Sequence, residues 1–305
     1  MIPATLYSSL FLYVVVIMTI IVASRLSHQN YQVIKRGQNN STLALIITMT
    51  LAVWIGQRPL HSVFGDSYYY AHSFYVLKAG ALDYHIAKGD VLWQIFTDWS
   101  AHLMDISSYF TIISIGYFLF TYLVCRLLVK NNVLAALLFM MGSFSFYSYG
   151  VNGIRNGLAC SIVLYSIALC ASSKKGILLT LLLSIIAINI HKSALLPIAC
   201  LLISMYFVKS FKWAYTFWIL SILISLVAGG FLTSLFAGMG FDDRLSYLST
   251  QPEDKFSHNG FRWDFLIYSM MPILLGYYVV IKRGISNRTY LILLNTYTLA
   301  NAFWV

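Results

Sequence analysis

Long apolar runs alternate with short polar junctions along almost the whole chain. A membrane-spanning helix needs about 20 mostly apolar residues, and roughly ten runs approach that length. This pattern predicts an all-α polytopic membrane protein with about ten transmembrane helices, forming a single transmembrane domain over residues 1–305. The runs lie near 4–23, 41–57, 108–129, 132–149, 154–171, 176–191, 193–208, 213–236, 263–281 and 289–305.

Two polar junctions are very short and two are long. The short ones, 148–155 and 191–192, each predict a tight, buried reversal between two apolar runs. The long segment 58–107 has aromatic and apolar residues at mixed helical spacing, which predicts short amphipathic helices on or in the membrane face. The alternative is a solvated loop with an interfacial aromatic belt. The segment 238–262 mixes acidic and basic residues, which suits either binding a polar ligand or staying solvated.

Composition supports the membrane assignment and removes one other class of function. With 59% hydrophobic and 10% charged residues, the chain lacks the polar residues to cover a water-soluble surface. The net charge of +10 does not indicate nucleic-acid binding, because Lys and Arg stand in ones, twos and threes at the ends of apolar runs. The four cysteines lie inside apolar runs without the paired spacing of a disulfide framework or a metal site.

Charge divides the junctions into two sides of the membrane. All acidic residues lie in the windows 66–105 and 242–264. When the chain is threaded through the runs with alternating sides, the other side has only basic residues, so the positive-inside rule makes that side cytoplasmic and the N-terminus external. The first run lacks a basic residue before it, so we expect a retained span rather than a cleaved signal peptide. The acid-free side carries Arg25, Lys35, Arg36, Arg126, Lys130, Lys174, Lys175, Lys209, Lys212, Lys282, Arg283 and Arg288.

Ionisable residues next to apolar runs are the candidates for chemistry, because charge near membrane depth is costly and usually faces a cavity or a partner. Arg155 follows Asn152 in a glycine-rich junction, where a planar guanidinium matches phosphate oxygens. An arginine that extends to the interface is the alternative. His191 lies at the second tight junction, where it can transfer a proton or serve as a structural group. Arg244 and Tyr247 stand one helical turn apart, and a solvated loop is the alternative there.

Four motifs occur in an order that resembles a known family. They are Asp66 followed by clustered tyrosines, Asp90 before Trp93, the run Tyr149–Ala159, and His191–Ala194. Together they resemble the EpsG-like family of bacterial exopolysaccharide and O-antigen (Wzy-type) polymerases along nearly the whole chain. The chain has Asn156 and Asp90 where the resemblance leads us to expect Gln and Glu. The resemblance also implies at least one further segment after Val305, so we expect the C-terminus to be truncated.

The resemblance implies a GT-C-like membrane glycosyltransferase in a bacterial inner membrane, with its active site facing the periplasm or cell exterior. Donor and acceptor would be oligosaccharide repeat units linked to a polyprenyl diphosphate such as undecaprenyl diphosphate. Arg155 would stabilise the leaving diphosphate, while Asp66, Asp90 and His191 are the candidates for the base. The substrate-binding candidates are Arg244, Arg262, Asn152, Tyr70, Lys192 and Tyr247.

No cofactor and no metal ion is expected, since no ligand spacing argues for one. The expected partners are the lipid-linked donor and acceptor, membrane lipids and, as a further candidate, a protein that regulates chain length.

Three alternatives remain open from the residues. A ligase that transfers finished glycan shares the donor and the arginine chemistry. A membrane acyltransferase would use His191 with Asn189 nearby to activate a hydroxyl group. A transporter of polysaccharide biosynthesis would place ionisable groups near the midplane and often show repeated halves, whereas these charges gather at one membrane face.

Overall fold

The computed structural model describes residues 2–28, 40–80, 90–143, 145–172, 176–238 and 263–304. All regular secondary structure in these residues is helical, so the all-α prediction is confirmed for them. The chain divides into two compact units, Met1–Leu195 and Leu196–Val305. The expectation of a single transmembrane domain stays a prediction.

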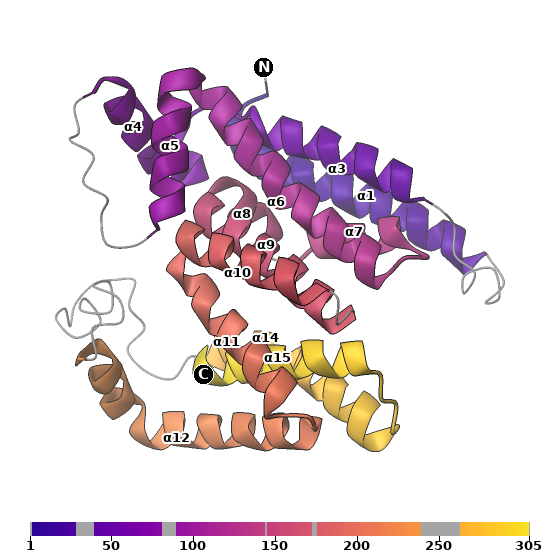
Figure 1. The fold of residues 1–305 in the computed structure, drawn as a ribbon. Helices are drawn as coiled ribbons and strands as arrows, with labels where there is room; N and C mark the ends of the chain where they lie inside the picture. The colour runs from indigo at the N-terminus through magenta and orange to yellow at the C-terminus, as the bar shows by residue number, and fades with distance from the viewer. Residues whose placement is uncertain are drawn as a thin grey trace. The chain divides into compact units, whose positions relative to one another are not determined.

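The first unit is built around α6, with α3 and α9 packed along it (Figure 1). Its core joins Phe11 of α1 and Phe118 of α6 to Phe146 of α8, whose rings lie within 6.5 Å of one another, centroid to centroid. Within a bilayer such a core is stabilised by close packing rather than by exclusion of water. The helices of this unit are η1 Ala4–Leu6, α1 Tyr7–Ser27, α3 Ser41–Gly56, η2 Ser62–Phe64, α4 Ser67–Lys78, α5 Val91–Leu103, α6 Ile106–Leu128, α7 Val133–Met141, α8 Phe146–Val151, α9 Ile154–Ser172, α10 Ile177–Ile190 and η4 Lys192–Ala194.

The second unit contains the remaining helices. Phe211 and Trp218 of α12 are buried with Ile273 of α14 and Leu294 of α15. The helices are α11 Leu195–Tyr206, α12 Phe211–Gly238, α14 Trp263–Gly276, η6 Tyr277–Lys282, which is a π-helix, and α15 Arg288–Trp304.

Within the described residues, four helices are long and apolar enough to cross a membrane: Ala4–Ser27, Ile106–Leu128, Ile154–Ser172 and Phe265–Lys282. Shorter apolar helices cover Ser41–Gly56, Ile177–Ile190, Lys192–Tyr206 and Phe211–Val227. These helices correspond to every predicted run except 132–149 and 289–305. These apolar helices are those of a membrane protein. The predicted count of about ten spans is not confirmed.

The prediction of one continuous span over 132–149 is wrong. The run is divided into α7, which has 9 residues, and α8, which has 6. At 1.5 Å per residue, α7 is only ~14 Å long, less than half of a ~30 Å hydrocarbon core. Gly142 and Ser143 follow α7 as a turn and bend, so the apolar run contains its own break.

The last run, 289–305, forms a helix with a polar buried face. In α15 the side chains of Asn295, Thr296, Thr298 and Asn301 are buried. Asn301 Oδ1 accepts a hydrogen bond of 2.7 Å from Trp218 Nε1, and Asn295 Nδ2 donates one of 2.9 Å to Val208 O. Polar side chains of this kind join helices inside a membrane protein, which explains the low hydropathy of this helix.

The predicted short helices of segment 58–107 are present as α4 and α5. Trp93 of α5 and Phe74 of α4 are buried, and both rings lie within 6.2 Å of the Tyr109 ring at the start of α6. The Thr97 and Tyr109 hydroxyls lie 3.0 Å apart in the same cluster. The apolar faces of these helices therefore pack on the helix bundle, which fixes α5 beside the first turns of α6.

Candidate anion-binding site at the α8–α9 turn

The turn between α8 and α9 places Arg155 in the first helical turn of α9. Its tightness depends on Gly157, because a Cβ atom there would lie 2.5 Å from the Tyr149 carbonyl oxygen. No real side chain accepts that distance without moving the backbone. The glycine therefore lets the start of α9 pack directly against α8. The reversal between two spans that the sequence suggests for this junction stays a prediction.

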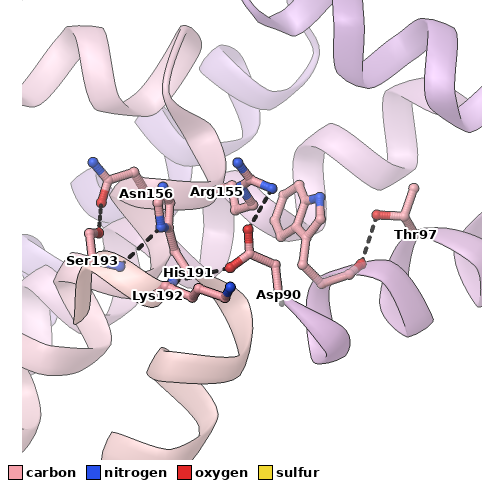
Figure 2. Close-up of polar contacts among 8 residues, drawn as sticks. Asp90, Thr97, Arg155, Asn156, His191, Lys192 and Ser193 are labelled. Atoms are coloured by element: carbon pink, nitrogen blue, oxygen red, sulfur yellow. Dashed lines mark hydrogen bonds and ion pairs between the residues drawn. The ribbon is translucent and has the colours of Figure 1, made fainter. Parts of the chain in front are cut away.

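Arg155 forms an ion pair with Asp90, which lies far earlier in the chain. Arg155 Nη1 lies 2.8 Å from Asp90 Oδ2, and the two side chains are only 18% and 12% exposed. Figure 2 shows the two side chains pointing toward one another, from α9 and from the residue before α5. Two sequence-predicted candidates thus form one sheltered charged group.

The same aspartate also forms a hydrogen bond with the turn after α10, the second short junction of the sequence. Asp90 Oδ1 accepts a hydrogen bond of 3.1 Å from the Lys192 backbone N–H (Figure 2). Asp90 adopts a left-handed backbone conformation with φ +52°, which non-glycine residues rarely occupy. Both carboxylate oxygens are therefore engaged, and they connect α5, α9 and the turn after α10.

His191 and its neighbours form a hydrogen-bonded turn beside α9. His191 Nδ1 accepts a hydrogen bond of 3.2 Å from the Ser193 N–H, and Ser193 Oγ donates one of 3.0 Å to Asn156 Oδ1 (Figure 2). An Nδ1 atom that accepts places the proton of a neutral imidazole on Nε2. Asn189 does not support the acyltransferase hypothesis, since its Nδ2 donates to Ile185 O on its own helix at 2.8 Å.

Asn152 holds the start of α4 against the same turn. Its Oδ1 accepts a hydrogen bond of 2.8 Å from the backbone N–H of Asp66, whose side chain is exposed. Gly65 has φ +56°, and a Cβ there would lie 2.4 Å from Asn152 Oδ1. The asparagine oxygen that we considered for substrate binding thus has a structural partner. Among the described residues, the Asp66 carboxylate forms no ion pair with Arg155.

Tyr70 lies beside the site through an aromatic contact. Its ring meets that of Trp93 edge to face, with 5.6 Å between centroids. This arrangement fits either an aromatic platform or simple packing of α4 on α5.

A buried cation that we did not single out in the sequence completes the scaffold. Arg58 is 5% exposed, and its guanidinium donates to Ile55 O at 3.0 Å, Ser67 Oγ at 2.6 Å and Val151 O at 3.1 Å. It also lies 4.7 Å from the centroid of the Phe110 ring. Burial lowers the pKa of Arg58 to about 10. Arg58 thereby joins the end of α3 to α4 and to the last residue of α8, just before Asn152.

Arg155 has a donor that its contact with Asp90 does not use. A guanidinium has five N–H donors, and Nε of Arg155 is buried without a hydrogen-bond acceptor among the described residues. A cation held by a carboxylate in a sheltered site is pre-organised to stabilise negative charge. Removing one member of such a pair leaves the other charge without compensation.

The remaining candidates can be placed only in part. Arg244, Tyr247 and Arg262 lie outside the described residues. The described part of the chain contains no group of three or more His, Cys, Asp or Glu side chains placed to hold a metal ion. Metal independence stays a prediction.

The comparisons with known proteins give one family match. A family model described as EpsG family matches residues 41–305. Curated proteins and solved structures yield no match.

Proposed function

The chain belongs to the EpsG family of polymerase-like membrane proteins in polysaccharide biosynthesis, and we propose that it polymerises lipid-linked oligosaccharide repeat units. In the proposed reaction a sugar hydroxyl of one repeat unit attacks the anomeric carbon of another. The bond from that carbon to the polyprenyl diphosphate breaks, and the diphosphate leaves with the electron pair. The reaction is expected on the periplasmic or outer face of a bacterial inner membrane.

The observation that carries this proposal is the sheltered Arg155–Asp90 pair. Negative charge develops on the leaving diphosphate, and a pre-organised guanidinium in a water-poor site stabilises it strongly. Asp90 orients Arg155 and also accepts from the Lys192 N–H, so we assign it a positioning role. With both oxygens engaged, Asp90 is a poor candidate for the base.

Among the other two candidates, the contacts favour Asp66 as the base. His191 Nδ1 already accepts from the Ser193 N–H, so that nitrogen is poorly placed to take a proton from the attacking hydroxyl. Asp66 is exposed, and its backbone is tied to Asn152, three residues before Arg155. A carboxylate in such a place can orient the attacking hydroxyl and accept its proton.

A complementation experiment tests the role of Arg155. In a strain deleted for this chain, Arg155→Ala is expected to slow bond formation by about 10²–10³, the usual cost of losing a pre-organised donor, so that the ladder of glycan lengths is lost. Arg155→Lys is expected to recover only part, because a lysine lacks the planar fork. The measurement is the ladder of glycan lengths at matched protein levels in the membrane.

Lys78→Ala is the matched control, because it removes one exposed cation from the last turn of α4 on the same predicted side. It is expected to leave the ladder unchanged. A normal ladder from Arg155→Ala would refute the role of Arg155. Long chains that accumulate on the lipid carrier in the deletion strain would instead identify a ligase.

A further inference from the structure

A cavity lies at the other end of α6 from the candidate site. Its volume is about 530 Å³, and two leucines of α6 contribute to its lining. The other lining residues are Ser41, Arg126, Lys130, Val133 and Tyr165. From Tyr109 to Arg126 the helix rises ~25 Å, so the cavity is separated from the Arg155–Asp90 pair by most of a membrane thickness.

The two cations of this cavity are not neutralised by an acidic side chain in the described part of the chain. Arg126 and Lys130 are exposed, and the ion pairs found among the described residues involve other side chains. No Asp or Glu stands between Asp105 and Asp242 in the sequence. Two neighbouring cations without a carboxylate favour an anionic ligand.

The N-termini of two helices lie at the same cavity. Ser41 is the first residue of α3 and Val133 is the first of α7, helices of 16 and 9 residues. The first N–H groups of a helix have no acceptor within it, and the helix dipole favours an anion there. This arrangement adds the two helix dipoles to the two cations, although the Leu134 N–H in the first turn of α7 already meets Asn40 Oδ1.

The walls of the cavity are held by long-range hydrogen bonds. The Ser41 and Tyr122 hydroxyls lie 2.7 Å apart, and Asn40 Oδ1 accepts from the Leu134 N–H at 3.3 Å. The start of α3 is therefore tied to both α6 and α7. Such a site is built before a ligand arrives, which lowers the entropic cost of binding.

We infer that this cavity binds the phosphate headgroup of an anionic membrane phospholipid. The cations, the hydroxyls and the helix starts match a phosphate, and the leucines match the beginning of its acyl chains. The cavity lies at the end of a membrane-length helix, where headgroups are found. This site is independent of the proposed polymerase reaction.

Native mass spectrometry of the purified full chain, titrated with phosphatidylglycerol in detergent, tests the inference. Arg126→Gln with Lys130→Gln is expected to lower the affinity for phosphatidylglycerol at least about tenfold, from the usual contribution of a cation near an anionic headgroup. Phosphatidylcholine, whose headgroup has no net charge, is expected to bind more weakly to the unchanged chain. The charge-retaining exchange Arg126→Lys with Lys130→Arg is expected to keep most of the affinity.

The matched control is Lys209→Gln with Lys212→Gln, which removes two exposed cations from the same predicted side without touching the cavity. It is expected to bind phosphatidylglycerol as the unchanged chain does. An equal loss in both glutamine variants, or equal affinity for the two lipids, would overturn the inference. Inorganic phosphate that binds as tightly as phosphatidylglycerol would identify a free phosphate ligand and contradict the lipid assignment.

Discussion

At the scale of single residues, Asp90 is the side chain on which the arrangement of the site depends. One carboxylate oxygen meets Arg155 and the other meets the Lys192 backbone. In the proposed polymerase reaction the carboxylate would orient the cation before the phosphate arrives. This assigns Asp90 to positioning rather than to proton transfer.

A double-mutant cycle separates the structural from the catalytic role of this pair. Arg155→Ala and Asp90→Ala are each expected to lower the free energy of unfolding by about 1–3 kcal/mol, below the ~3–5 kcal/mol of a fully buried pair. The double variant is expected to be less destabilised than the sum, because no uncompensated charge remains. Thermal unfolding in detergent measures stability, and the glycan ladder should be absent from the Arg155→Ala variants. Additive losses of stability would show that the two side chains are not coupled.

At the scale of helices, the approach of α9 to α8 determines where Arg155 lies. Gly157→Ala is expected to destabilise the protein by about 1–3 kcal/mol, the usual cost of an overpacked contact, and to shorten the glycan ladder. The reason is the 2.5 Å distance from the new Cβ to Tyr149 O. Thermal unfolding and the ladder are measured together.

Gly153→Ala is the control in the same turn. A Cβ at Gly153 would meet its nearest neighbour, Tyr149 Cδ1, at an ordinary 3.4 Å. This variant is expected to keep both stability and activity. Equal behaviour of the two alanine variants would mean that close packing of α8 and α9 does not position the site.

The local helices and turns could be predicted from the sequence, while the contacts between them could not. The spacing in segment 58–107 predicted α4 and α5, and the glycines near Arg155 predicted the short connection before α9. The pairing of Asp90 with Arg155 depends on how α5 packs, which no local pattern encodes. Arg58 was missed because it resembles an ordinary interfacial cation; its position directly after the apolar run of α3 was the available signal.

The run 132–149 shows a different limit. Its hydropathy predicts one span, but Gly142 and Ser143 end α7 after 9 residues. Hydropathy averaged along a window does not show where a helix ends. A glycine followed by a serine is the signal that predicts such an end.

At the scale of the whole molecule, the distribution of charge predicts which side of the membrane carries the site. In a cysteine-free background, Lys78→Cys is expected to react with a membrane-impermeant maleimide added outside, and Lys130→Cys is not. The two positions lie before and after α6, which at 23 residues is ~35 Å long, enough to span a ~30 Å hydrocarbon core. The measurement is the extent of maleimide labelling of each cysteine in intact cells. Labelling of permeabilised cells is the control. The reverse pattern would move every proposed site residue to the cytoplasm.

The central claim, that Arg155 in its sheltered site promotes departure of a lipid-linked diphosphate, is tested most directly by reconstitution. The purified chain in proteoliposomes is supplied with a synthetic polyprenyl-diphosphate repeat unit, and both glycan length and released polyprenyl diphosphate are measured. The unchanged chain is expected to yield a ladder with one diphosphate released per bond formed, and folded Arg155→Ala to yield neither. A full ladder from Arg155→Ala, or no polymer from the unchanged chain, would contradict the account.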